Sequence, residues 1–140
     1  FERGAGGENG FFVPLGSQFP ASVNGMSVEL VSIDEYKKTQ RINSLLLKFA
    51  VDYDKICGRL VIRNRMPGDK IRPVGRNVTK SFKKLFNENN IPEDMREALQ
   101  VLADDNGVLW LYGFGADARA AVDASTKRVL LMGKVPNLEV

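Results

Sequence analysis

The sequence predicts a β-rich α+β fold, because strand patterns recur along the chain and two short helical segments lie together in its middle. Near the N-terminal end, apolar and polar residues alternate with a period of two, as in a half-buried strand. Further along, two apolar runs flank DDNG, which is the strongest hairpin signal in the chain. The length of 140 residues is enough for one hydrophobic core. We expect a flexible tail or linker at 1–10 and a single domain at 11–140.

The elements in the first third of the chain are predicted to be mainly strands. The alternation at 26–30 predicts the first of them. Asp34 is expected to cap a short helical turn that extends through Lys38. The apolar run at 44–51 is typical of a buried strand.

A strand at 59–63 is predicted to end at a tight turn. Its arginines point away from the face that carries Leu60 and Ile62. Gly68 follows Pro67, and glycine suits the position of a type II turn that requires a positive φ. The next residue, an aspartate, is expected to bond nearby backbone amides or to orient a neighbouring arginine. The turn residues are therefore interpreted as structural: Pro67, Gly68 and Asp69.

Two helices are predicted to follow this turn. The first covers 79–89, and its apolar face is formed by Val78, Phe82, Leu85 and Phe86. Three lysines centre on the opposite side of this helix: Lys80, Lys83 and Lys84. Asn90 is expected to cap a second short helix, with Pro92 near its start. Its inward residues are predicted to be Met95, Ala98 and Leu99.

The last third of the chain is predicted to begin with the hairpin around DDNG. Trp110 lies in the second strand of this hairpin and is expected to pack in the core. One helical turn is predicted at 117–122, and a last strand at 128–132.

The net charge of +3 hides a strong local excess of cations. Residues 59–84 contain nine Lys or Arg and one acid, Asp69, which gives +8 for this stretch. The rest of the chain holds eleven bases and sixteen acids, which gives −5. Like charges held close repel one another, so such a cluster favours binding to a polyanion. The alternative is a solvated loop and helix face.

The composition excludes several classes of site and of location. The absence of His rules out His-based acid–base chemistry, and the single Cys57 cannot build a zinc site. Asp52 and Asp54 could share a metal, but without a third ligand nearby we favour turn capping and pairing with Lys55. No catalytic residue and no metal site are predicted. One cysteine suggests a reducing, cytoplasmic setting, and the missing apolar run argues against a membrane partner.

The start of the chain carries neither the basic nor the apolar region of a signal peptide. It also lacks an initial Met, which suggests a piece of a longer protein.

The basic stretch is therefore the strongest functional signal, and a phosphate backbone is the ligand that it favours. Phe82 and Phe86 fall on the predicted core face of the helix, so aromatic residues do not interleave with the cations. This argues against a stacking platform for single strands and favours folded or double-stranded RNA. The candidate contacts are Arg63, Arg65, Lys70, Arg72, Lys80, Lys83 and Lys84.

These motifs resemble a known family over residues 52–118. A strand ending in Arg-x-Arg meets a Pro-Gly-Asp turn, then come a Lys-rich helix, an Ile-Pro pair with a downstream Arg, and a hairpin with Trp and Gly. The matching positions are Arg63, Arg65, Pro67, Gly68, Asp69, Lys80, Lys83, Lys84, Ile91, Pro92, Arg96, Trp110 and Gly113. With this order of motifs the chain resembles the C-terminal domain of bacterial tRNA(Ile)-lysidine synthetase.

The resemblance implies a layered β-sandwich with helices, as in the B3/B4 domain of the phenylalanyl-tRNA synthetase β subunit. It also implies a parent ligase that uses ATP, with Mg, to attach lysine to an anticodon cytidine of the minor isoleucine tRNA. In that family the nucleotide loop S-G-G-x-D-S lies in an N-terminal catalytic domain, and no such string occurs here. This fragment is therefore expected to bind no cofactor and to catalyse nothing alone.

The implied role of this domain is to hold the acceptor stem of the tRNA, with Arg96 as a further, weaker candidate contact. The implied partners are the tRNA and the catalytic domain of the same chain. The alternative is a structural module that packs on the catalytic domain or forms a homodimer, using its basic surface on an acidic partner. A third possibility, an enzyme for small phosphorylated molecules, is disfavoured because no base or nucleophile accompanies the cations.

Overall fold

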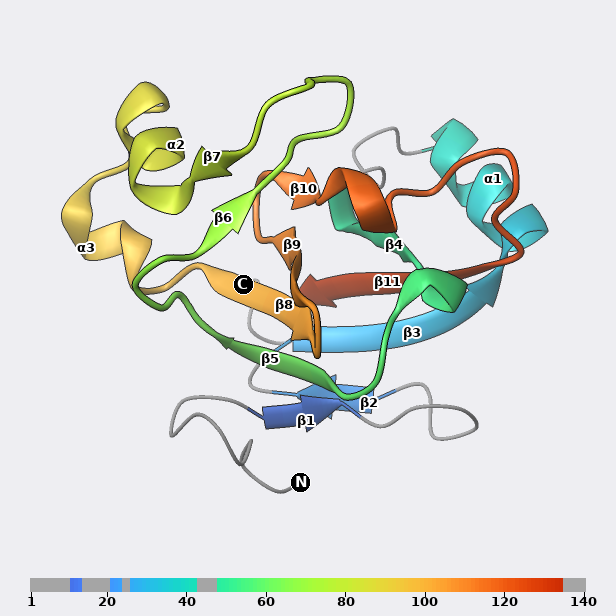
Figure 1. Ribbon diagram of the computed structural model, residues 1–140. Helices are drawn as coiled ribbons and strands as arrows, with labels where there is room; N and C mark the ends of the chain where they lie inside the picture. Colours follow the sequence, from blue (N-terminus) through green and yellow to red (C-terminus); the bar gives the residue numbers. More distant parts are fainter. Residues whose placement is uncertain (1–10, 14–20, 24–25, 43–47, 135–140) are drawn as a thin grey trace.

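A computed structural model of the chain describes residues 11–13, 21–23, 26–42 and 48–134 (Figure 1). The predicted flexible tail at 1–10 lies outside the described residues, so the division into tail and domain stays a prediction. The described part consists of antiparallel sheets with helices on their outer faces.

The first sheet has five strands in the order β1-β5-β8-β9-β10. They are β1 (Phe11–Val13), β5 (Leu60–Asn64), β8 (Gln100–Asp104), β9 (Gly107–Leu111) and β10 (Gly115–Ala116). The predicted hairpin is confirmed as β8–β9, with Asp104 opposite Gly107. Trp110 in β9 is fully buried, as predicted, and its Nε1 donates to the carbonyl oxygen of Lys48 at 2.7 Å.

The second sheet has four strands in the order β2-β3-β11-β4. They are β2 (Ala21–Val23), β3 (Met26–Ser32), β11 (Arg128–Lys134) and β4 (Ala50–Asp52). The predicted strands at 26–30 and 128–132 are confirmed as parts of β3 and β11, which pair along their whole length. Of the strand predicted at 44–51, residues 50–51 lie in β4 and residues 48–49 do not, and 43–47 lie outside the described residues.

The two sheets pack face to face, and each carries a helix on its other face. The central core joins side chains from both sheets: Met26, Val28, Val51, Leu60, Ile62, Leu102, Leu109, Trp110, Leu130 and Met132 are among them. Helix α1 (Ile33–Ile42) covers the second sheet through Tyr36. Helix α2 (Phe82–Glu88) covers the first sheet through Phe82 and Phe86, which pack on Val101 of β8. The predicted layered, β-rich arrangement is thus confirmed.

A small third sheet, β6 (Lys70–Ile71) with β7 (Lys80–Ser81), lies beside α2 (Figure 1). We call its connection, residues 72–79, the β6–β7 loop. Two 3-10 turns complete the described elements, η2 (Tyr53–Lys55) and η3 (Ala118–Ala120). The second confirms the helical turn predicted at 117–122.

The helix prediction at 79–89 was wrong at its start. Lys80 and Ser81 pair with β6, and the hydroxyl of Ser81 accepts from the Lys84 amide at 3.1 Å, so the helix begins at Phe82. Val78 lies in the β6–β7 loop and is 47% exposed rather than in the core. Lys80 therefore lies on a strand and not on the cationic face of the helix.

The other helices also differ from the predictions. Helix α1 is a full helix, capped by Ser32 rather than Asp34, since the Ser32 hydroxyl accepts from the Glu35 amide. Helix α3 (Glu93–Arg96) follows Pro92 without a side-chain cap, and Asn90 instead adopts a left-handed φ of 55°. Of the residues expected to face inward, Met95 and Ala98 are exposed, whereas Leu99 is partly buried and packs against the core beneath α2, as predicted.

The turn predicted at residues 67–69 is confirmed. The amide of Asp69 donates to the carbonyl of Met66 at 3.1 Å, which closes a β-turn with Pro67 and Gly68 at its centre. Gly68 has a φ of +87°, as a type II turn requires.

Within the described ranges, no helix has both the length and the apolar character needed to cross a bilayer.

Candidate nucleic-acid interface

The predicted contact residues divide into cations with carboxylate partners and cations without them. Four of the eight pair with an acid of the same chain, and four form no ion pair with a described residue. The paired ones are Arg63, Arg65, Lys80 and Arg96, and the others are Lys70, Arg72, Lys83 and Lys84. Of the seven cations in the predicted cluster, three therefore have a carboxylate partner: Arg63 pairs with Asp69 inside the basic stretch, and Arg65 and Lys80 pair with acids from outside it.

Arg63 is held by the turn that follows its strand. Its two terminal nitrogens donate to the two carboxylate oxygens of Asp69 at 2.8 and 3.0 Å, and both side chains are largely buried. The same carboxylate accepts from the Met66 amide at 2.7 Å. Asp69 thus bonds a backbone amide and orients an arginine, as the sequence predicted.

Arg65 and Lys80 are each fixed beside α2. Arg65 donates to Glu97 at 3.0 Å, and its guanidinium carbon lies 5.8 Å from the ring centre of Phe86. Lys80 donates to Glu88 at 2.5 Å, and this hydrogen bond lowers the pKa of Glu88. The charges of Lys84 and Arg76 lower the same pKa further, so the helix and the β6–β7 loop contribute to one local field.

Arg96 is buried and bonds both the last turn of α2 and the segment that joins α2 to α3. Its Nε donates to the carbonyl oxygen of Ile91 at 2.8 Å, and a terminal nitrogen donates to Asn87 at 3.0 Å. Its guanidinium carbon also lies 5.6 Å from the ring centre of Phe86, and a terminal nitrogen lies 3.5 Å from a carboxylate oxygen of Glu93. These contacts explain Arg96 as part of the fold.

The remaining cations are exposed and lie on neighbouring elements. Lys83 and Lys84 project from α2, Lys70 from β6, and Arg72 from the β6–β7 loop, where it bonds Asn77. Arg76 in the same loop is also exposed and forms no ion pair with a described residue. The sequence reasoning counted Arg76 in the basic stretch but did not select it, because no strand or helix spacing pointed to it.

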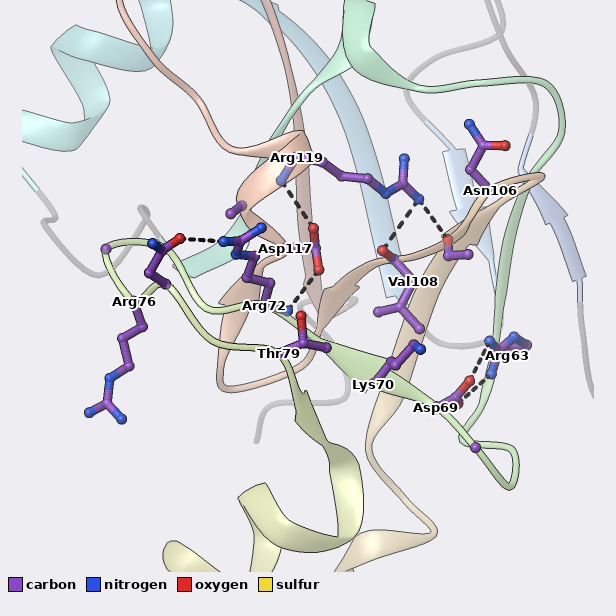
Figure 2. A pocket seen from close by; sticks show the side chains of 15 residues that line it. Arg63, Asp69, Lys70, Arg72, Arg76, Thr79, Asn106, Val108, Asp117 and Arg119 are labelled. Carbon is purple, nitrogen blue, oxygen red and sulfur yellow. Dashed lines mark hydrogen bonds and ion pairs between the residues drawn. The ribbon is translucent and has the colours of Figure 1, made fainter.

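A cleft of about 900 Å³ opens next to these cations (Figure 2). Segments distant in the sequence form it: the turn after β5, β6 with its loop, the tip of the β8–β9 hairpin, and η3. Its charged lining consists of Arg63, Asp69, Lys70, Arg72, Arg76, Asp117 and Arg119. Five bases against two acids make the cleft electropositive, and a concave shape concentrates that field.

Asp117 anchors the basic loop at one side of the cleft. One of its carboxylate oxygens accepts from the Arg72 amide at 2.8 Å, and the other accepts from the Arg119 amide at 3.0 Å. The Ala118 amide also donates to the Arg72 carbonyl oxygen at 2.8 Å. The loop is therefore attached to η3 across a wide gap in sequence.

Arg119 was missed by the sequence reasoning and forms another wall of the cleft. It donates to both oxygens of the buried Asp104, at 3.2 and 2.7 Å. Burial raises the pKa of Asp104, but the hydrogen bonds from Arg119 and from the amides of Cys57 and Asn106 outweigh it and leave the pKa below its ordinary value. The ion pair is thus a rigid structural element with its positive end toward the cleft.

The charged groups of the described residues suit the binding of anions rather than of metal ions. Among residues 26–42 and 48–134, no group of three His, Cys, Asp or Glu could hold a metal. Asp52 caps η2 and bonds Thr126, and its ammonium partner is Lys55 at 3.7 Å, which agrees with the capping role that we favoured. The cations themselves suit phosphate groups, since guanidinium and ammonium groups donate strong hydrogen bonds to them.

The sequence of this chain matches a known protein family. The sequence model of the family described as "TilS substrate C-terminal domain" matches residues 60–132, which is more than half of the chain. This chain belongs to that family. The family resemblance seen in the sequence is thereby confirmed.

Curated relatives of this TilS C-terminal domain are named tRNA(Ile)-lysidine synthase. The one from Caldanaerobacter subterraneus subsp. tengcongensis is 31% identical over 105 residues, which cover 75% of this chain and 21% of the relative. The one from Dehalococcoides mccartyi is 36% identical over 80 residues, covering 57% and 17%. That from Solibacter usitatus is 30% identical over 123 residues, covering 88% and 28%. The chain thus spans between 17% and 28% of the length of these relatives.

A solved structure shares the fold. The "Crystal structure of TILS C-terminal domain" superposes with a TM-score of 0.64, covering 90% of this chain and 98% of that chain at 23% identity. The β-rich α+β fold predicted from the sequence is therefore that of a TilS C-terminal domain.

Proposed function

We propose that this chain is the tRNA-docking domain of a tRNA(Ile)-lysidine synthase. The observation that carries the proposal is that exposed cations gather on adjacent elements of a domain from this family. They are Lys70, Arg72, Arg76, Lys83 and Lys84. Phosphate groups of a folded RNA supply the countercharge that these side chains lack. The other predicted contacts, Arg63, Arg65 and Lys80, orient the surface through their ion pairs.

The proposal extends to the activity of the whole enzyme. A separate N-terminal domain would use ATP, with Mg, to ligate lysine to a cytidine in the anticodon of the minor isoleucine tRNA. The present domain would hold the acceptor stem, supply binding energy far from the reacting base and restrict its position. A cytoplasmic location, where this tRNA is used, belongs to the same proposal.

A matched pair of double variants tests the proposal. Lys83→Ala/Lys84→Ala removes two exposed charges from α2, and Lys37→Ala/Lys38→Ala removes two exposed charges from α1. The α2 variant should weaken tRNA binding in a filter assay at low salt, and the α1 variant should bind almost as the wild type does. Equal affinities for the two variants would refute the proposal.

The same variants separate RNA docking from the structural alternative. A module that packs on the catalytic domain or forms a homodimer would lose that protein partner when the α2 lysines are removed. Titration of each variant with the separate catalytic domain, and sedimentation of the chain alone, measure these contacts. Loss of the protein contact with unchanged tRNA affinity would establish the alternative.

A further inference from the structure

The cleft is concave, whereas the surface of α2 that carries the lysines is not part of it, so the two surfaces can bind different parts of one ligand. Lys83 and Lys84 are exposed on α2 and do not line this cleft, and Lys83 borders a separate, smaller pocket of about 350 Å³. The cleft itself is walled by the β6–β7 loop, the hairpin tip and η3 (Figure 2). The backbone of an RNA duplex is convex and can lie across exposed lysines. A concave site of about 900 Å³ has instead the size that proteins use for nucleotide-sized ligands.

Three of the five cations of the cleft are held by other side chains before any ligand arrives, and one of them is Arg72, which bonds Asn77. Arg63 is held by Asp69 and Arg119 by Asp104, each through two hydrogen bonds. Of the other two, Lys70 and Arg76, the guanidinium of Arg76 extends away from the other labelled side chains in Figure 2. Such preorganisation reduces the ordering cost of binding.

Lys70 is the cation that a ligand in the cleft can engage. It lines the cleft and is exposed, and its ammonium group has no hydrogen bond or ion pair with a described residue. Figure 2 shows its side chain directed into the cleft from β6. An ammonium group in this position can donate to a phosphate without first breaking an internal bond.

The neutral lining of the cleft suits a sugar better than a base. The hydroxyl of Thr79 and the carboxamide of Asn106 line it and bond no described side chain or backbone group, so both can serve ribose hydroxyls. No aromatic side chain is among the lining residues. A base would therefore find no ring to stack on, although stacking dominates sequence-tolerant binding of single strands elsewhere.

We propose that the cleft holds one unpaired nucleotide at the end of the bound RNA, through its phosphate and ribose, with Lys70 as the phosphate ligand. The inference rests on the proposed RNA-docking function and adds a second contact to it. Duplex phosphates lie on the α2 lysines, and a nucleotide that leaves the duplex enters the cleft. Because phosphate and sugar are common to all nucleotides, the identity of the base has little effect.

The test compares hairpins that differ only at their ends, using the full-length protein that carries this chain. One hairpin is blunt, and the others carry a short unpaired extension at the 3′ or the 5′ end. We expect at least one extension to raise the affinity of the wild type about tenfold, the size of one charge-assisted hydrogen bond. The gain should be the same for extensions of A, C, G or U.

Single-charge variants then locate the contact. Lys70→Ala should abolish the gain from the extension, and Lys70→Arg should retain it. Lys83→Ala removes an equal charge outside the cleft, so it should weaken binding to all hairpins by one factor and keep the gain. A wild type that binds blunt and extended hairpins equally, or a Lys70→Ala variant with the full gain, overturns the inference but leaves the docking function standing. Failure to bind any hairpin or tRNA would instead refute the docking function.

Discussion

Asp69 joins the end of β5 to the turn that follows it by gripping Arg63 with both of its carboxylate oxygens, at 2.8 and 3.0 Å. The pair is nearly enclosed, with side-chain exposures of 13% for Arg63 and 10% for Asp69. It therefore stabilises the geometry of the cleft wall and leaves little of the arginine for a ligand.

Replacing Asp69 should consequently lower the stability of the folded protein. Asp69→Ala leaves a largely buried guanidinium without its carboxylate and removes the acceptor of the Met66 amide, so we expect a loss of about 2–4 kcal/mol. Urea denaturation measures it. Asp105→Ala at the exposed hairpin tip is the control and should change stability by less than about 0.5 kcal/mol. Indistinguishable midpoints for the two variants would contradict this interpretation.

Arg96 should behave as a structural residue and not as an RNA contact. Arg96→Ala removes its bonds to Ile91 and Asn87 and its contact with Phe86, so it should cost about 2–3 kcal/mol of stability. Thermal unfolding gives the loss, with exposed Lys83→Ala as the variant that should melt almost like the wild type. At a temperature where both are folded, Arg96→Ala should keep its tRNA affinity and Lys83→Ala should not. The opposite pattern would return Arg96 to the list of contacts.

Stability should fall in acid through Asp104. Burial raises its pKa, but hydrogen bonds led by that from Arg119 lower it more, so the folded state holds this carboxyl ionised below the pKa of the unfolded chain. A lowered folded-state pKa means stability that is fully present above the unfolded pKa, about 4, and is lost as the pH falls through the lower folded value. Urea midpoints measured from pH 7 down to pH 3 should therefore decline below about pH 4.

The variant Asp104→Asn isolates this contribution. It should be less stable than the wild type at neutral pH, because the charge on Arg119 loses its partner. Below about pH 4 the difference between the two proteins should shrink, since the Asp104 carboxyl of the unfolded wild type then binds a proton, which favours unfolding. A difference that stays constant across the range would show that Asp104 does not cause the acid sensitivity.

Binding to tRNA should depend steeply on salt. If the five exposed cations each neutralise one phosphate, the plot of log affinity against log salt should have a slope of about −4 to −5. Lys83→Ala/Lys84→Ala should reduce the steepness by about 2, and Lys37→Ala/Lys38→Ala on α1 should leave it unchanged. Filter binding at several salt concentrations gives these slopes, and an unchanged slope for the α2 variant would place the RNA elsewhere.

Local patterns in the sequence were sufficient where neighbours along the chain decide the structure. The DDNG turn and its apolar flanks gave the β8–β9 hairpin, and Pro67-Gly68 gave the turn after β5. The prediction failed where a distant strand intervenes. Lys80 and Ser81 have a helix-compatible pattern, yet β6 pairs with them and delays the start of α2.

The candidate site shows the same division. A count of charges was enough to find the basic stretch, but it could not show which of its cations have a carboxylate partner in the folded protein. Arg65 meets Glu97 from 32 positions away, and Arg119 in η3 meets Asp104 from 15 positions away. Spacing rules describe one strand or one helix, whereas this cleft is assembled from several segments by the packing of the sheets. For the same reason Arg76 and Arg119 were not selected.

Asp117 accepts one hydrogen bond from the amide of Arg72 and one from the amide of Arg119, and this pair of bonds affects which nucleic acids can bind. These bonds attach the β6–β7 loop to the part of the fold on which α2 also packs. The distance between the loop and the helix is therefore fixed before a ligand binds. The cations of the loop and those of the helix thus form two binding sites at a fixed distance. A polyanion whose phosphates are spaced by this distance binds both sites, whereas one with another phosphate spacing binds only one and dissociates sooner.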